Sequence, residues 1–561
     1  EAFTRETETH HKSFSEGARE MSRNTNQKLK NWFLERSRTC DRVHKADALY
    51  QFAPCLRGPI LMPTRRQTLW GLGGAAVATV GGLSLLSNLR SHAGPSASAV
   101  QSSFKLPEIL KGTRKGAETV YDLQLQTGTS NFLEGLKTET IGINQPYLGP
   151  LLEMQSGESV KLNVHNTLDE TATLHWHGFH LPARFDGNPH QAIAPGETWS
   201  AQFVVRQRGG LYWYHSHAHK RSGPQVYRGL AGPIYVRDEE SDALDLPSEY
   251  GVTDLPLIVQ DRAFQRDGQL IYGTSMHTLM MGMLGDTLLV NGVIDPVFEY
   301  TTDLLRLRLL NGSNARIYRF SFNDGRSMRQ IASDGGLLVA PVPLTNIILS
   351  PGERAEILVD LSNGQPAQLV AHPVQNSMMG GRMMRGRMGN RQMRGSGPEF
   401  PVLSLLPAPT RRSAEPVPGR LLQLTRPNPA AAVRTRRFVM NMPMGMMEGG
   451  FTINGKTMDM TRIDERVKLD TSEIWHIENT SMMAHPFHIH DVQFRILDRN
   501  GRPPSAAESG LKDTVLVSPG ETVRLLLAFS DYSDPNTPYM YHCHILEHED
   551  AGMMGQFTVE A

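Results

Sequence analysis

Tyr539-Met540-Tyr541-His542-Cys543-His544, near the end of the chain, repeats a stretch near its beginning, Tyr212-Trp213-Tyr214-His215-Ser216-His217. Most of the sequence after about residue 100 resembles these stretches, with short alternating runs broken by Gly, Pro and Asn. Such runs are typical of β-strands. The sequence therefore predicts an all-β fold with one strand plan at both ends.

Turn motifs extend the repetition to the middle of the chain. Pro-Gly-Glu occurs at 195–197, 351–353 and 519–521, and an asparagine follows a β-branched residue at 143–144, 290–291 and 453–454. The spacing gives three units of about 150 residues, an ordinary domain size. We expect domains over 100–243, 244–406 and 415–561.

Four His-x-His pairs indicate metal binding. On a strand, residues i and i+2 share a face, so each pair presents two imidazoles side by side, and imidazole suits copper, zinc and iron. Chance predicts about one such pair in this composition, whereas four at equivalent places favour a cluster of three ions over surface or core histidines. The pairs are His175/His177, His215/His217, His488/His490 and His542/His544.

A second ligand set surrounds Cys543. The spacing Cys-x₄-His-x₄-Met, with a histidine upstream, can give a trigonal His₂Cys site with a weak axial thioether, which is diagnostic of blue copper. The set is His485, Cys543, His548 and Met553. Strand alternation then turns Cys543 one way and His542 and His544 the other. The sequence predicts a short covalent path between the blue copper and the cluster; the alternative is a buried structural thiol.

These motifs resemble those of the multicopper oxidases, over roughly residues 105–561. The resemblance implies three cupredoxin-like Greek-key β-sandwich domains. It also implies four copper ions, one blue type 1, one type 2 and two type 3, with dioxygen as the electron acceptor. His175 and His488 resemble the type 2 ligands, and the type 3 ligands would be His177, His215, His217, His490, His542 and His544.

Two acids resemble the proton-relay residues of this family. Asp186 lies in Phe185-Asp186-Gly187, and Glu549 follows the blue-copper loop. Both could instead be ordinary surface carboxylates.

Within the family, the chain is most similar to bacterial copper-efflux oxidases, whose substrate is Cu(I). A Met-rich insert at 376–394 fits this likeness, because thioethers favour Cu(I). The alternative is a disordered Met/Arg loop without function. Ser481 stands near the place of an acidic substrate-copper ligand, and the insert carries arginines. The candidate Cu(I) ligands are Met378, Met379, Met383, Met384, Met388, Met393, Met482 and Met483.

The N-terminal region predicts export. Thr64-Arg65-Arg66-Gln67-Thr68-Leu69 precedes an uncharged stretch, so we expect residues 62–93 to be a twin-arginine signal peptide and the mature protein to be periplasmic. The alternative, a membrane anchor, is disfavoured by many glycines. We expect residues 1–61, which include Cys40, to be upstream sequence from a misassigned start codon. Cys55 also lies in this stretch, so both cysteines would be lost with it. Cys543 would then be the one thiol of the mature protein.

Composition and the ligand set separate the remaining functions. Lys plus Arg and Asp plus Glu both total 57, which gives no basic excess for nucleic acid. The leading hypothesis is an oxidase acting on Cu(I), or on phenols and diamines as a laccase does. A cell-division scaffold of the same family would have lost its ligands, a copper store needs no cluster, and two-domain nitrite reductases lack this arrangement.

Overall fold

Alternating burial marks the strands of this protein. The computed structural model describes residues 102–374, 399–424, 428–442 and 450–561. β7 (Ser159–Asn166) and β26 (Thr471–Asn479) bury nearly every second residue, as a strand does when one face lies on a core. The described residues form six sheets and only short helices. The predicted all-β class is confirmed.

The first repeat forms two sheets around a core that includes Leu162, Trp176 and Tyr214. One sheet has the order β2 (Ile109–Lys111), β6 (Leu151–Gln155), β11 (Ala231–Arg237), β10 (Gly210–His215), β8 (His175–His177). The other has the order β3 (Thr113–Lys115), β4 (Glu118–Ser130), β7, β9 (Thr198–Val204), with β5 (Thr138–Ile143) on β4. Its helices are η1 (Ala183–Phe185), α2 (Ser222–Arg228) and α3 (Glu239–Asp242).

The second repeat has its own core, which includes Leu307, Phe320 and Ile357. One sheet has the order β13 (Thr287–Val290), β12 (Asp254–Arg262), β15 (Leu304–Asn311), β20 (Arg354–Asp360), β17 (Met328–Ser333), β18 (Gly336–Leu344). The other has the order β1 (Ser102–Ser103), β14 (Pro296–Thr302), β22 (Phe400–Arg412), β21 (Ala367–Pro373), β16 (Tyr318–Phe322), β19 (Asn346–Leu349). Its helix is α4 (Met276–Met281).

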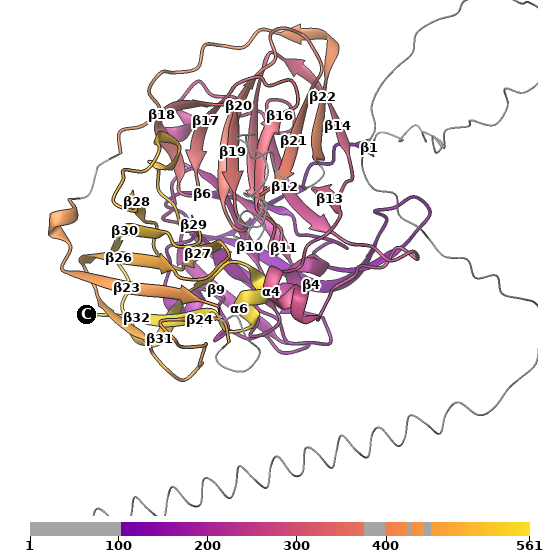
Figure 1. The fold of residues 1–561 in the computed structure, drawn as a ribbon. Coiled ribbons are helices and arrows are strands. Elements are labelled where there is room, and N and C mark those ends of the chain that lie inside the picture. The colour runs from indigo at the N-terminus through magenta and orange to yellow at the C-terminus, as the bar shows by residue number, and fades with distance from the viewer. Residues whose placement is uncertain (1–101, 375–398, 425–427, 443–449) are drawn as a thin grey trace, which may run out of the picture. The chain divides into compact units, whose positions relative to one another are not determined.

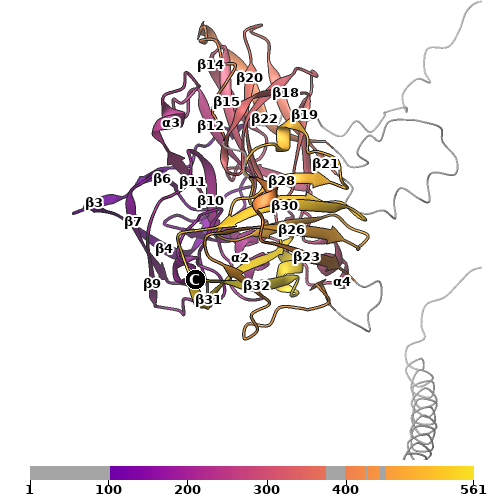
Figure 2. The same ribbon diagram turned by 90° about the vertical axis from the view of Figure 1, so that its left-hand side faces the viewer.

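The third repeat packs around Trp475, Phe487 and Cys543. One sheet has the order β24 (Thr452–Ile453), β23 (Arg434–Asn441), β26, β30 (Thr522–Phe529), β28 (Arg495–Arg499). The other has the order β25 (Glu465–Lys468), β32 (Met554–Glu560), β31 (Asp534–Cys543), β27 (His485–Ile489), β29 (Thr514–Val517). Its helices are η2 (Pro429–Ala431), η3 (Ala506–Glu508) and α6 (Leu546–Asp550). Figure 2 shows this repeat, orange to yellow, beside the indigo first repeat.

The three repeated asparagines have the same conformation. Asn144, Asn291 and Asn454 have φ angles of 59°, 51° and 54°, the left-handed region that asparagine tolerates better than most residues. Each side-chain amide accepts from one strand N–H and donates to the carbonyl two residues earlier: Gln124 and Asp122, Ile258 and Pro256, Val439 and Arg437. The motif therefore fixes the same corner in each repeat, whereas the domain boundaries stay a prediction.

Strand pairing places the histidine motifs in equivalent positions. β10 pairs antiparallel with β8, so that His215 lies opposite His175. β31 pairs antiparallel with β27, so that His542 lies opposite His488. The first and third repeats thus each contribute two neighbouring strands with His-x-His at their ends.

Candidate metal centres

The eight histidines of the four pairs converge in the interior, where the first and third repeats meet. All eight are at most 1% exposed. His175 stacks on His490 with ring centroids 3.9 Å apart, and His177 stacks on His488 at 3.8 Å. Each stack joins one repeat to the other, so the interface between the repeats is itself the histidine cluster.

Backbone carbonyls orient four of these rings. A nitrogen that faces a carbonyl must donate, so Nδ1 carries the proton and Nε2 keeps its lone pair. The carbonyl partners are those of Asp186 for His175 (2.8 Å), Ser216 for His215 (2.9 Å), Asp513 for His488 (2.9 Å) and Cys543 for His542 (3.1 Å). The Nε2 atoms of His175 and His488 are buried without a hydrogen-bond partner. The rings are therefore oriented as metal ligands are.

The remaining nitrogens face one another. His217 Nε2 and His490 Nε2 lie 3.2 and 3.3 Å from His542 Nε2, and His177 Nδ1 lies 3.3 Å from His215 Nε2. Burial, reinforced by the neighbouring imidazoles, holds the pKa of His177, His217 and His490 well below the usual value, so these rings are neutral at pH 7. Buried lone pairs in such numbers need a shared cation, and the donor set fits copper.

The second constellation lies on the other side of β31. Cys543 Sγ is 3.4 Å from His485 Nδ1 and 3.7 Å from His548 Nδ1, and the two nitrogens are 3.3 Å apart. Met553 is buried beside them and its carbonyl accepts from the Cys543 N–H. Burial raises the pKa of the Cys543 thiol, so its thiolate form requires a cation. These donors fit a blue-copper ion.

Known proteins share this arrangement. Two family profiles described as multicopper oxidase match residues 124–241 and 426–561. A multicopper oxidase from Staphylococcus aureus is 35% identical, over 78% of this chain and 88% of that protein. This chain belongs to the multicopper oxidase family. It is accordingly an oxidoreductase of a copper-binding family, and its fold is cupredoxin-like.

Two further relatives bear on the activity of this multicopper oxidase. A solved structure of CueO, a bacterial laccase-like multi-copper oxidase from Ochrobactrum sp., aligns with a TM-score of 0.73 and 36% identity, over 81% of this chain and all of that one. The cell division protein FtsP of Pectobacterium atrosepticum is 36% identical, over 83% of this chain and 94% of that protein. Family membership indicates dioxygen and a reductant as substrates. Among the described residues, no helix has the length and apolar character to cross a membrane.

Both acids predicted as relay residues contact the cluster histidines of this multicopper oxidase. Asp186 Oδ2 is 2.7 Å from His490 Nδ1, and its Oδ1 is 3.4 Å from His175 Nδ1. Glu549 lies 3.2 Å from His217 Nδ1 and 3.3 Å from His542 Nδ1. Burial raises the pKa of Glu549 well above its usual value. Neither acid lies at the surface, since Asp186 is 0% and Glu549 2% exposed.

Sequence reasoning missed a buried ion pair that supports the cluster. Asp513 accepts from both terminal nitrogens of Arg354 at 2.7 Å, and its Oδ1 lies 3.0 Å from His177 Nε2. His177 comes from the first repeat, Arg354 from the second and Asp513 from the third. The one available signal was the place of Arg354 directly after Pro-Gly-Glu, where the other two copies have Thr198 and Thr522.

The predicted substrate methionines are only partly described. Met378, Met379, Met383, Met384, Met388 and Met393 lie outside the described residues, as does the signal sequence at 62–93. Met482 is half-buried and Met483 is buried. Ser481, where an acid would be expected, is 2.8 Å from His485 Nε2. The Ser481 hydroxyl therefore forms a hydrogen bond with His485, a candidate blue-copper ligand, and brings no negative charge to the site.

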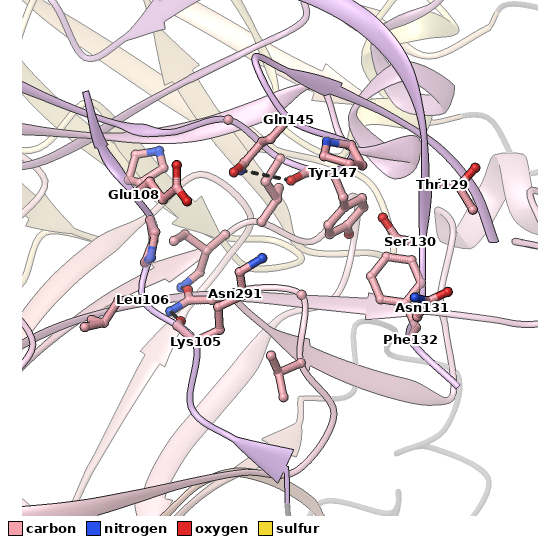
Figure 3. A pocket seen from close by; sticks show the side chains of 18 residues that line it. Lys105, Leu106, Glu108, Thr129, Ser130, Asn131, Phe132, Gln145, Tyr147 and Asn291 are labelled. Carbon is pink, nitrogen blue, oxygen red and sulfur yellow. Dashed lines mark hydrogen bonds between the residues drawn. The ribbon is translucent and has the colours of Figure 1, made fainter. Parts of the chain in front are cut away.

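A cavity among the described residues lies elsewhere. It has a volume of about 330 Å³ and lies between strands of the first and second repeats, lined by residues such as Phe132, Tyr147 and Asn291 (Figure 3). None of the cluster histidines lines it, so it has no part in the chemistry of the cluster.

His180 joins the first repeat to the third at the edge of the cluster. Its Nδ1 is 2.7 Å from Asp491 and its Nε2 is 3.0 Å from Asp531. Burial alone would lower the pKa of His180, but the two carboxylates outweigh it and raise the pKa to about 9. His180⁺ therefore stabilises the fold fully below the unfolded-state pKa of about 6.5. That contribution is lost as the pH rises through about 9.

We therefore predict a pH-dependent effect of His180→Gln on the copper-loaded protein. The substitution should cost roughly 1–2 kcal/mol near pH 6, discounted because Asp531 is partly exposed, and much less at pH 10. Thermal unfolding midpoints of both proteins at pH 6, 8 and 10 measure this difference. A gap that is the same at all three pH values would contradict the charged bridge.

Proposed function

We propose that this protein couples the one-electron oxidation of Cu(I) to the four-electron reduction of dioxygen to water. The observation that carries the proposal is the tripeptide His542-Cys543-His544. Cys543 Sγ faces His485 and His548, while His542 Nε2 faces His217 and His490. Electrons that arrive at the cysteine therefore have a covalent path to the histidines.

The ligand groups support four copper ions. His485, Cys543, His548 and Met553 would hold the type 1 ion, and His175 and His488 the type 2 ion. The type 3 pair would be shared by His217, His490 and His542, which lie within 4.8 Å of one another, and by His177, His215 and His544. Bound copper would supply a one-electron couple at the cysteine and a place for dioxygen to accept electrons at the histidines.

Asp186 and Glu549 serve as proton carriers in this proposal. Reduction of one dioxygen to two waters consumes four protons as well as four electrons, and these two acids contact the far side of the cluster rings. Ser222 donates a hydrogen bond to Glu549, and Asn188 Nδ2 donates to Asp186 Oδ2 at 3.0 Å. Each carboxyl group is thereby held beside the cluster, where dioxygen would take up the protons.

Cu(I) is the preferred substrate because the chain offers many soft thioethers, which favour Cu(I). The six methionines of the insert would gather Cu(I), together with Met482 and Met483. In this proposal the protein is exported through the twin-arginine machinery to the periplasm and has no membrane anchor. Its role there would be copper tolerance.

Two other functions have specific support. The Ochrobactrum relative is described as active towards lignin model compounds and lignosulfonate, which favours a laccase acting on phenols. The likeness to FtsP raises the alternative that this protein is a non-enzymatic scaffold. The presence of all twelve candidate ligand residues, buried and grouped, favours an enzyme over a scaffold.

The insert offers the test of substrate. β21 and β22, which flank it, pair antiparallel, so a short Gly-Ser linker can replace 376–394. We expect the Cu(I) oxidation rate to fall by about tenfold, or about 1.4 kcal/mol of transition-state stabilisation, with phenol turnover equal or higher. Both rates are followed as dioxygen uptake.

A variant with the six insert methionines changed to leucine is the matched control. It keeps the length of the insert and removes only the thioethers, so its Cu(I) oxidation rate should fall by about the same tenfold while its phenol oxidation stays as in the wild type. Unchanged Cu(I) kinetics in both variants would exclude the insert from the reaction. A wild type that takes up no dioxygen with either reductant would overturn the oxidase.

A further inference from the structure

Helix α4 covers the outer edge of the blue-copper site. Residues 275–283, Ser275-Met276-His277-Thr278-Leu279-Met280-Met281-Gly282-Met283, contain four methionines. Ser275 caps the helix by accepting from the Thr278 N–H. The helix comes from the second repeat, yet Leu279 and Met280 pack against the core of the third. Figure 1 shows α4 beside α6, which carries His548.

The backbone of α4 holds the outward nitrogen of His548. His548 Nδ1 faces Cys543, and its Nε2 donates to the Met280 carbonyl at 3.2 Å. Phe451 stacks on the ring, with centroids 4.4 Å apart. The imidazole is 0% exposed. A reductant therefore cannot touch His548 directly, and the Met280 carbonyl is the hydrogen-bond partner of its outward nitrogen.

Two methionine side chains of α4 lie on one face of the helix, and one of them reaches solvent. Met276 and Met280 are four residues apart in the helix, so their side chains share a face. Met276 is 50% exposed, whereas Met280 is partly buried against the core that contains Cys543. Thioethers are soft ligands that select Cu(I) and bind Cu(II) weakly. The pair can therefore take up a cuprous ion and release it after oxidation.

A buried carboxyl group lies at the end of α4. Glu547 is 5% exposed, and its Oε2 has no hydrogen-bond partner among the described residues. Its Oε1 accepts from Tyr272 and Asn314. A side chain at Gly282, the residue that ends α4, would meet Oε2 at 3.2 Å. Oε2 therefore lies against the end of α4 as a further oxygen donor.

We propose that Met276 and Met280 on α4, beside the Glu547 carboxylate, form the site at which Cu(I) delivers its electron. The proposal rests on Cu(I) being the substrate. One Cu(I) becomes Cu(II) and leaves. Its electron crosses the hydrogen bond between Met280 and His548 to the blue-copper ion at Cys543, and dioxygen is the final oxidant. The insert can collect the ion first, but α4 is where it is oxidised.

Silver(I), which has the same charge and ligand preference as Cu(I) but is not oxidised here, gives a test that does not depend on turnover. The copper-loaded chain with the Gly-Ser linker in place of 376–394 is titrated with Ag(I), and binding is followed by calorimetry. We expect one Ag(I) to bind to this parent. Met276→Leu/Met280→Leu should weaken that binding at least roughly tenfold, the lower end of what losing a supporting group costs a metal site.

Met281→Leu is the matched control, because it makes the same exchange on the same helix but on another face. It should bind Ag(I) as the parent does and keep the parent's KM for Cu(I), whereas the double variant should raise that KM at least roughly tenfold. Exchange of Met for Leu conserves volume, and retention of the blue absorption checks that the variants fold.

The outcomes separate this site from the proposed function. Equal Ag(I) affinity in the parent and the double variant would overturn the site, as would an equal loss in Met281→Leu. Ag(I) bound by the methionine pair in a protein that does not oxidise Cu(I) would support a cuprous-binding site and overturn Cu(I) as the substrate.

Discussion

Cys543→Ser is expected to abolish the blue colour and to lower oxidase turnover by more than about 100-fold. Serine is a hard, weakly acidic ligand, so the trigonal site loses the thiolate that defines it. The loss should exceed the 10–100-fold that follows from removing groups that only support metal ligands. The measurements are the visible spectrum, copper per chain and dioxygen uptake, and copper should fall by one ion of the proposed four.

Ser216→Ala is the matched control for this change. Ser216 occupies the equivalent position between the histidines of the first repeat, where its hydroxyl donates to Gln225. It touches no candidate ligand sulfur or nitrogen of the blue-copper set, so its replacement should leave the colour in place. A blue Cys543→Ser protein, or a colourless Ser216→Ala protein with full copper, would contradict the assignment of Cys543.

Asp513→Asn should have the second large effect, on both stability and copper content. Arg354 is 1% exposed and would lose the nearer of its two carboxylate partners, keeping only Asp334 at 3.8 Å, which costs up to about 3–5 kcal/mol for a buried pair. The amide would also support His177 less well, so copper should bind the cluster about 10–100-fold more weakly. Thermal unfolding and copper analysis after dialysis against a chelator measure the two effects.

Glu473→Gln separates stability from metal support. Glu473 is 2% exposed and accepts two hydrogen bonds from Arg436, also in the third repeat, but it contacts no cluster histidine. It should lose a similar free energy of unfolding and retain its cluster copper. If both variants lost copper in parallel with stability, the specific role of Asp513 would be wrong.

The residues proposed as copper ligands could be predicted because their pattern is local in the sequence. The four histidine pairs and the loop from Cys543 to Met553 follow from strand alternation and ligand type, and the structure brings all twelve residues into two groups. Asp186 and Glu549 were singled out from short motifs, and both lie against the rings of the cluster histidines. The all-β class followed from the alternating runs and their turns.

The supporting groups were not predictable, because their partners lie far apart in the sequence. Arg354 and Asp513 are 159 residues apart, and neither belongs to a metal-binding motif. Ser481 looked like the loss of a charged ligand, whereas it holds His485. The second repeat keeps only turns and strands in its sequence pattern, yet it contributes both Arg354 and α4. Such roles depend on how the repeats pack, which no local pattern records.

The junction of His177, Arg354 and Asp513 also has a consequence for biogenesis. Its members come from three successive parts of the chain, and the eight cluster histidines are spread from His175 to His544. The eight histidines of the proposed cluster can therefore come together only after translation has passed residue 544 and the first and third repeats have packed.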